Sequence, residues 1–202
     1  MKDMWQAERL YREKGCAAIC GADEAGAGPL AGRVYAAAVM LPFGIELPGV
    51  DDSKKLSEKK REDLFPVIQE RAVAWSIQWV EAEEIDRTDI LSARIRAMDM
   101  AIRALEPSAD FALIDGNRDK GKSWAISAPH QCVIGGDGKS LNIAAASILA
   151  KVSRDRYMRE MDALYPQYGF ARHKGYPTAL HFARLEEFGP SPIHRRSFLK
   201  KL

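Results

Sequence analysis

The sequence has 202 residues, 47% of them hydrophobic and 29% charged, with a formal net charge of +2. The longest apolar run is far shorter than the ~20 residues of a membrane helix, the chain opens without a signal-peptide core, and three cysteines make no disulfide framework. These features exclude a membrane protein and a disulfide-rich secreted protein. They predict one soluble, cytoplasmic domain over residues 1–202 that does not bind membranes.

The first part of the chain predicts one helix and two strands. Residues 3–14 form an amphipathic pattern typical of a short helix. Residues 17–26 read as a strand that ends in a glycine-rich turn, and residues 33–41 form a second apolar strand. We expect these two strands to pair like a hairpin.

Capping residues mark the next helices. Ser57 is expected to cap a helix that Pro66 kinks or interrupts. Residues 72–80 are rich in β-branched and aromatic side chains, which favours a third strand. Asp89 is expected to cap a long helix over residues 90–105, where apolar residues recur at helical spacing.

The second half of the chain mixes strands with helices. Residues 110–115 predict a fourth strand, and residues 131–136 predict a short fifth strand or an extended loop. Long and short helices follow at about 141–164 and 179–188. This order indicates an α/β domain with a mixed β-sheet flanked by helices, and a C-terminal helical part at about 165–202.

Four acidic residues lie at strand or loop ends within two residues of a glycine: Asp23, Glu24, Asp115 and Asp137. If the first and fourth strands are neighbours, their terminal carboxylates converge, because ligand sites in α/β sheets form at strand ends. Clustered carboxylates need neutralisation, and hard divalent cations prefer oxygen ligands. Two such ions ~3.5–4 Å apart can activate water for phosphoryl transfer.

The alternative is that each acid only stabilises a turn or caps a helix, for which Asp is favoured. The adjacent pair Asp23 and Glu24 is harder to explain in this way. Successive strand residues face opposite sides of a sheet, so we expect an irregular strand end if both bind metal. Gly26 and Gly28 would allow such an irregular end.

Six ordered blocks give the chain a resemblance to bacterial ribonuclease HII, the type II ribonuclease H. They read DEAGAGPLAG, DSKKLS, LIDGN, GDGKSLNIAAASILAKVSRDRYM, YGFARHKGY and GPSPIHRRSF. The resemblance implies a ribonuclease H-like fold and Mg²⁺- or Mn²⁺-dependent hydrolysis of the RNA strand of RNA–DNA hybrids. It also implies incision 5′ of single ribonucleotides embedded in duplex DNA, with 3′-hydroxyl and 5′-phosphate ends. The family precedent further implies a monomer.

The same resemblance assigns roles to particular residues. The four acids named above become the metal ligands and catalytic residues. The loop Gly26-Ala27-Gly28 becomes the reader of the ribose 2′-hydroxyl, and Tyr176 becomes the ring that stacks on the neighbouring sugar. Expected phosphate contacts are Lys54, Lys139 and Ser140, with Lys55, Arg172, His173 and Lys174 as further candidates.

The chain departs from the family pattern at the recognition loop, where Ala27 stands in place of arginine. Backbone contacts can persist, but a charge-assisted side-chain contact cannot. We therefore predict retained recognition of the ribonucleotide with weaker binding or lower activity. Arg33 replaces the usual proline nearby and could supply the missing charge, and Pro177 stands where glycine is common.

Several other polar residues have plainer interpretations. Asp155 is expected to pair with a nearby arginine on its helix, and Arg195 and Arg196 to form ion pairs or contact phosphates. His173 and His194 are expected to be hydrogen-bonded in the structure rather than to transfer protons. Two other functions stay open: a DNA-only nuclease of the integrase or Holliday-junction resolvase kind, and a catalytically weak hybrid-binding protein.

Overall fold

The computed structural model describes residues 3–50, 53 and 55–200. Its five-stranded sheet has the order β3-β2-β1-β4-β5. The strands are β1 (Ile19–Ala25), β2 (Val34–Met40), β3 (Ala74–Val80), β4 (Phe111–Asp115) and β5 (His130–Val133). β1 pairs with β2 in antiparallel fashion and with β4 in parallel fashion. The predicted hairpin-like pairing is therefore confirmed, and the condition for convergent carboxylates, neighbouring first and fourth strands, is met.

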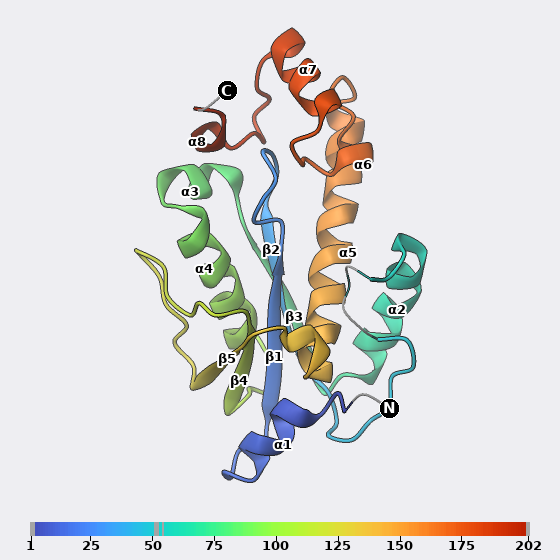
Figure 1. Cartoon of the computed structure of the whole chain (residues 1–202), viewed down its shortest axis with the longest axis vertical. Coiled ribbons are helices and arrows are strands. Elements are labelled where there is room, and N and C mark those ends of the chain that lie inside the picture. The colour runs from blue at the N-terminus through green and yellow to red at the C-terminus, as the bar shows by residue number, and fades with distance from the viewer. Residues whose placement is uncertain (1–2, 51–52, 54, 201–202) are drawn as a thin grey trace.

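Helices cover both faces of the sheet and gather at its two ends (Figure 1). α4 packs on one face, and α5 with α2 packs on the other. α6, α7 and α8 lie at the end where β1 finishes, while α1 lies at the opposite end. The helices are α1 (Gln6–Arg12), α2 (Glu58–Arg71), α3 (Ala82–Arg87), α4 (Ile90–Arg103), α5 (Leu141–Leu164), α6 (Phe170–His173), α7 (Ala179–Phe188) and α8 (Arg196–Leu199).

Small residues bring α5 unusually close to β1. A Cβ atom at Gly21 would lie 2.3 Å from the backbone nitrogen of Ile143 and 2.4 Å from the carbonyl carbon of Asn142. The alanines at 144–146 are fully buried in the same interface. This contact places the start of α5, and the loop before it, beside the strand that carries Asp23 and Glu24.

The predicted helix caps at Ser57 and Asp89 are confirmed, since each side chain accepts a hydrogen bond from the backbone N–H three residues further on. The structure adds a third cap of the same kind, Thr178 at the start of α7. These bonds satisfy N–H groups that the first helical turn leaves without partners. No described helix combines the length and apolarity that crossing a bilayer requires.

The predicted interruption at Pro66 is wrong, because α2 continues through that residue to Arg71. Pro66 itself is exposed, whereas Leu64, Phe65 and Ile68 on either side of it are buried. The apolar contacts of this buried face offset the one backbone hydrogen bond that proline removes.

Candidate active site

A cavity of about 230 Å³ lies where β1 and β4 end. Three of the four predicted carboxylates line it: Asp23, Glu24 and Asp115. Residues 26–28 and Tyr176 line it as well. The structure therefore brings most of the predicted site residues together at one place.

The sheet register explains why these carboxylates meet. Parallel pairing sets Ala22 of β1 opposite Ile114 of β4, so Asp23 and Asp115 follow at the same level. β1 stays regularly paired with β2 as far as Ala25, and the predicted irregular strand end is therefore wrong. Asp23 and Glu24 leave opposite faces of the strand. Both nevertheless line the cavity, which lies beyond the end of β4 at Asp115.

Glu24 is held by a cation from α4. Nη2 of Arg94 lies 2.8 Å from Oε1 of Glu24, whereas Oε2 is buried with no hydrogen-bond partner among the described residues. Burial raises the pKa of Glu24, the charge of Arg94 opposes this rise, and the nearby charge of Asp115 adds to it. A buried carboxylate that is also raised in energy by the charge of a second carboxylate carries an electrostatic cost, which a bound cation would relieve.

Asp137 lies next to this cluster but outside the cavity lining. It is in a 3₁₀ turn over Gly136–Gly138, and the backbone N–H of Gly136 donates to Oδ1 of Asp115 at 2.9 Å. Within residues 3–50, 53 and 55–200, no three His, Cys, Asp or Glu side chains lie close enough together to hold a metal ion. The donor set still fits a divalent cation, since it consists of hard carboxylate oxygens, one of them buried without a partner.

Two buried arginines fix the loop that follows β1. Arg195 donates to the carbonyl oxygens of Gly26 at 2.6 Å and Ala27 at 3.1 Å, and also to those of Pro29 and Gly32. Its pKa falls to about 9 because of burial and because of the charge of Arg154. Arg195 binds the loop backbone rather than forming the ion pair that we predicted as one alternative.

Gly26 has to be glycine in this arrangement. Its φ is +99°, which side-chain-bearing residues rarely adopt, and a Cβ there would lie 2.1 Å from Nε of Arg154. The guanidinium of Arg154 in turn donates to the carbonyl oxygens of Ala31 and Arg33. Both arginines therefore hold the loop in one conformation.

Tyr176 presents an exposed ring to the same loop. Its side chain is 42% exposed, and a Cβ at Gly28 would come within 3.8 Å of the ring. The backbone of Tyr176 is fixed on both sides, because its N–H donates to the carbonyl of His173 and its carbonyl accepts from Nδ1 of His181. A rigid, accessible ring beside the cavity suits stacking on a sugar or base.

Sequence reasoning missed three residues of α5 that line the cavity: Ser147, Lys151 and Arg154. Nζ of Lys151 lies 2.7 Å from Oδ1 of Asp155, which orients the lysine. The signal was present in the sequence, because polar residues at i, i+4 and i+7 interrupt an otherwise apolar stretch of helix. Asp155 also lies 3.6 Å from Arg61 of α2. Its arginine partner is therefore on another helix, and its partner on α5 is a lysine.

The predicted phosphate contacts occupy different environments. Lys54 lies outside the described residues, while its neighbour Ser53 lines the cavity. Lys139 is exposed and donates to the carbonyl of Ile134 at 2.8 Å. Ser140 is fully buried and caps α5, so its hydroxyl has no exposed surface to offer a phosphate.

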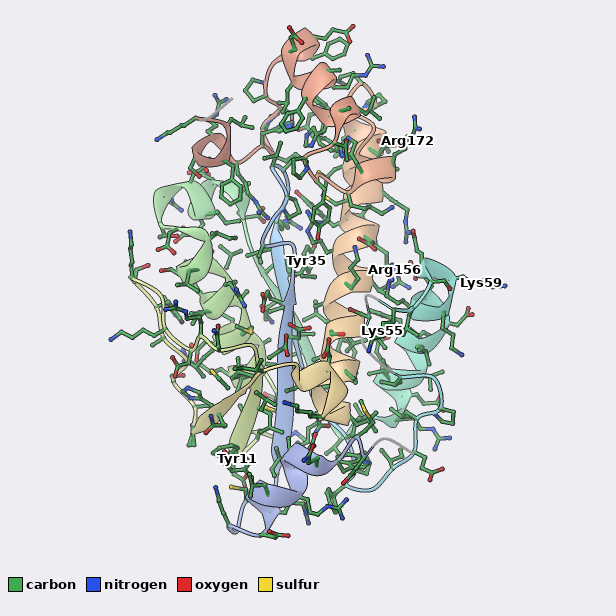
Figure 2. The ribbon with its side chains drawn as sticks, in the orientation of Figure 1. Tyr11, Tyr35, Lys55, Lys59, Arg156 and Arg172 are labelled. Atoms are coloured by element: carbon green, nitrogen blue, oxygen red, sulfur yellow. The ribbon has the colours of Figure 1, made fainter. Side chains whose placement is uncertain are left out.

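Basic residues gather on the side of the molecule that carries α2, α5 and α6. Lys55, Lys59, Arg156 and Arg172 all lie on this side (Figure 2). Arg156 is paired with Glu62 at 2.6 Å, whereas Lys55 and Arg172 are exposed. This face borders the cavity through α5 and offers positive charge to a phosphate backbone.

Arg33 does not supply the charge that Ala27 lacks. Its Nη2 lies 2.8 Å from Oε1 of Glu81, and its guanidinium packs over the rings of Trp79 and Tyr157 at 5.0 and 4.5 Å from their centroids. A guanidinium held by a carboxylate and two rings is already engaged outside the loop at residues 26–28. The expectation that Arg33 could compensate is therefore not supported by its contacts.

Comparison with known proteins decides the family. A family model described as Ribonuclease HII matches residues 20–201. The chain belongs to the ribonuclease HII family. It is 55% identical over 180 residues to Ribonuclease HII of Dechloromonas aromatica, covering 89% of this chain and 90% of that protein. It is 50% identical over 200 residues to Ribonuclease HII of Ruminiclostridium cellulolyticum, covering 99% of this chain and 77% of that protein.

Solved structures of other ribonucleases H share the fold. The ribonuclease H2 of Pyrococcus horikoshii matches with a TM-score of 0.74 at 24% identity, covering 90% of this chain and 93% of that one. A ribonuclease HIII solved in complex with Mn²⁺ matches with a TM-score of 0.61 at 19% identity, covering 86% of this chain and 63% of that one. The predicted α/β ribonuclease H-like fold is confirmed. As a ribonuclease HII, the chain is an endoribonuclease of the ribonuclease H class.

Proposed function

We propose that this endoribonuclease hydrolyses the RNA strand of RNA–DNA hybrids and also incises duplex DNA 5′ of a single embedded ribonucleotide. The products are a 3′-hydroxyl and a 5′-phosphate. The observation that carries this proposal is the position of the carboxylate cavity directly beside the loop at residues 26–28. Chemistry and recognition of one nucleotide can then occur within the same cavity.

The conformation of the loop supports a backbone role in recognition. The carbonyls of Gly26 and Ala27 point toward Arg195. In a trans peptide the N–H of the next residue points the opposite way, so the N–H groups of Ala27 and Gly28 face away from Arg195. These two residues line the cavity, and a 2′-hydroxyl distinguishes a ribonucleotide from a deoxyribonucleotide.

Divalent metal ions fit the carboxylate cluster. Asp23, Glu24, Asp115 and Asp137 are the residues that we propose to hold them. When bound, such ions lower the pKa of water and stabilise the charge that develops on oxygen during phosphodiester hydrolysis. The protein needs no separate general base for this chemistry, and Lys151 and Arg154 bring positive charge to the same cavity.

A single cleavage assay tests the proposal. A labelled DNA duplex with one ribonucleotide is incubated beside an all-DNA duplex, with Mg²⁺, with Mn²⁺ and with chelator. We expect metal-dependent incision only at the 5′ side of the ribonucleotide, with a downstream fragment that phosphatase dephosphorylates. Cleavage of the all-DNA duplex would support the DNA-only alternative, and tight binding without cleavage would support the hybrid-binding alternative.

Restoring arginine at position 27 is expected to strengthen binding. Ala27 is half-buried and lines the cavity, so a longer side chain there can reach a bound nucleic acid. A new hydrogen bond from a charged donor contributes about 1.5 kcal/mol, or roughly a tenfold lower Kd. Fluorescence anisotropy with the ribonucleotide-containing duplex, in chelator to prevent cleavage, measures the Kd of Ala27→Arg against the unmodified protein.

The matched control removes an arginine that is already present near the loop, Arg33. Because Arg33 is held by Glu81 and two rings, Arg33→Ala should leave the Kd within twofold. If the new arginine contacts a phosphate, the slope of log Kd against log salt concentration should also increase by about one, because one more counterion is released on binding. An unchanged Kd and salt slope for Ala27→Arg would show that the missing side chain does not limit binding.

A further inference from the structure

The N-terminal segment docks against the loop that carries Asp137. The backbone N–H of Leu141 donates to the carbonyl of Met4 at 2.6 Å, and the N–H of Ala7 donates to the carbonyl of Lys139 at 3.2 Å. α1 therefore lies beside the start of α5, at the end of the molecule opposite α6–α8 (Figure 1). This contact joins two segments that are more than 130 residues apart in the sequence.

A buried glutamate lies at the centre of this contact. Glu8 is 1% exposed, and its Oε1 accepts from the hydroxyl of Ser140 at 2.5 Å and from the backbone N–H of Asn142 at 3.4 Å. Oε2 is buried without a hydrogen-bond partner in the described part of the chain. Burial raises the pKa of Glu8 to about 7.

Stability alone does not explain a carboxylate at this position. Burying a carboxyl group with one oxygen unpaired costs free energy that an apolar side chain would not. The group is aimed at Ser140, whose hydroxyl also accepts from the N–H of Ile143 and so begins α5. Glu8 thus orients the residue at which the loop becomes a helix.

The loop is held at both ends. At one end Gly136 donates to Asp115 at 2.9 Å. At the other end the N–H of Ser140 donates back to the carbonyl of Gly136 at 2.8 Å, and the hydroxyl of Ser140 is held by Glu8. Asp137 lies between these two fixed points, in the 3₁₀ turn over Gly136–Gly138.

We infer that Glu8 is a positioning residue for the nuclease site. Through its hydrogen bond with Ser140, Glu8 fixes the position of the loop that carries Asp137. This inference rests on the proposed role of Asp137 as a metal ligand. Substitution of a residue that orients a metal ligand without touching the metal typically weakens metal affinity 10- to 100-fold. Glu8 is not among the residues that line the cavity, so we expect it to affect metal binding and not the binding of nucleic acid.

The test measures metal binding and substrate binding separately. Mn²⁺ affinity is measured by the electron paramagnetic resonance signal of free Mn²⁺, and duplex affinity by anisotropy in chelator. We expect Glu8→Ala to weaken Mn²⁺ binding about tenfold and to leave the duplex Kd unchanged. Glu8→Gln keeps the Oε1 acceptor for Ser140 and should restore Mn²⁺ affinity to within about threefold.

Two further variants keep the test decisive. Glu8→Asp shortens the side chain by one methylene and retains the acid, so it should weaken Mn²⁺ binding even if Glu8→Ala does not fold. Glu13→Ala, at an exposed position at the end of the same helix, should bind Mn²⁺ normally. Normal Mn²⁺ affinity in both Glu8→Ala and Glu8→Asp, or failure of Glu8→Gln to restore it, would overturn the inference.

Asp137→Asn separates failure of the inference from failure of the proposed function. If Asp137→Asn weakens Mn²⁺ binding while the Glu8 variants do not, the metal site stands and Glu8 has no part in it. If Asp137→Asn binds Mn²⁺ like the unmodified protein, Asp137 is not a ligand. That result would overturn both the proposed metal site and the role of Glu8.

Discussion

Asp115→Asn is expected to lower the cleavage rate by about 1,000-fold, which corresponds to about 4 kcal/mol of transition-state free energy. Asparagine removes the negative charge that a divalent cation requires but keeps an oxygen at the position of Oδ1. That oxygen can still accept the hydrogen bond from Gly136 that is 2.9 Å long in the unmodified protein. The variant should therefore fold normally and fail in chemistry.

Single-turnover cleavage of the ribonucleotide-containing duplex at saturating protein measures the chemical step, with Mg²⁺ and Mn²⁺ tested in parallel. Asp119→Asn is the matched control, since it is the same substitution four residues further along. Asp119 is exposed and pairs with His130 at 3.2 Å, so its loss should change the rate less than twofold. An Asp115→Asn rate within tenfold of normal would contradict a catalytic role for this carboxylate.

The sheet and the long helices could be predicted because each depends on local sequence. The apolar runs of β1, β2 and β4 and the apolar period of α4 are visible along the chain, and Asp89 caps α4 with bonds to a residue three positions away. By contrast, α6 and α8 have four residues each. A segment that short covers about one turn, so it carries no periodic signal.

The carboxylates of the site could be predicted, but the groups that hold the site could not. Asp23 and Asp115 are recognisable because each ends an apolar strand. Arg195 binds the carbonyl of Gly26, 169 residues away. Arg94 reaches Glu24 from α4, the helix on the face of the sheet opposite α5. Such contacts depend on how distant segments pack. A basic residue in the sequence therefore gives no sign of whether it binds phosphate or backbone.

Acid is expected to destabilise the C-terminal segment through three buried histidines. Ser191 N–H donates to Nδ1 of His194 at 2.9 Å, so the proton of His194 is on Nε2, which lies 2.9 Å from Nε2 of His181. Nδ1 of His181 then donates to the carbonyl of Tyr176. His173 stacks on His181 with ring centroids 4.3 Å apart. This chain of bonds requires neutral histidines.

The pKa shifts set the direction of the effect. Burial, and then the charge of His181, lowers the pKa of His194 to about 4 from an ordinary value of 6.5, and burial also lowers the pKa of His173 and His181. Between pH 6.5 and 4 the unfolded chain binds protons that the folded chain does not. The free energy of unfolding therefore falls as the pH falls, by about 3 kcal/mol for His194 alone.

Protonation of Glu8 changes the free energy of unfolding in the opposite direction over almost the same pH range. Its pKa is about 7 in the folded protein against 4.5 when unfolded, so the folded state binds the extra proton as the pH falls from 7. Stability then rises by a similar amount, about 3 kcal/mol, and the raised pKa of Glu24 adds to this rise. The unmodified protein should consequently show only a shallow pH dependence between pH 7.5 and 4.5.

Variants separate the two contributions. Glu8→Gln removes one titrating group, so its free energy of unfolding, measured by urea denaturation, should fall by about 3 kcal/mol more than that of the unmodified protein between pH 7.5 and 4.5. His194→Asn keeps an acceptor for Ser191 N–H and removes the acid-sensitive ring, so its stability should increase relative to the unmodified protein as the pH falls. Parallel curves for all three proteins would mean that neither group is buried in the charge state that the contacts indicate. Opposite slopes for the two variants would show that the buried carboxyl of Glu8 and the buried ring of His194 change the free energy of unfolding in opposite directions as the pH falls.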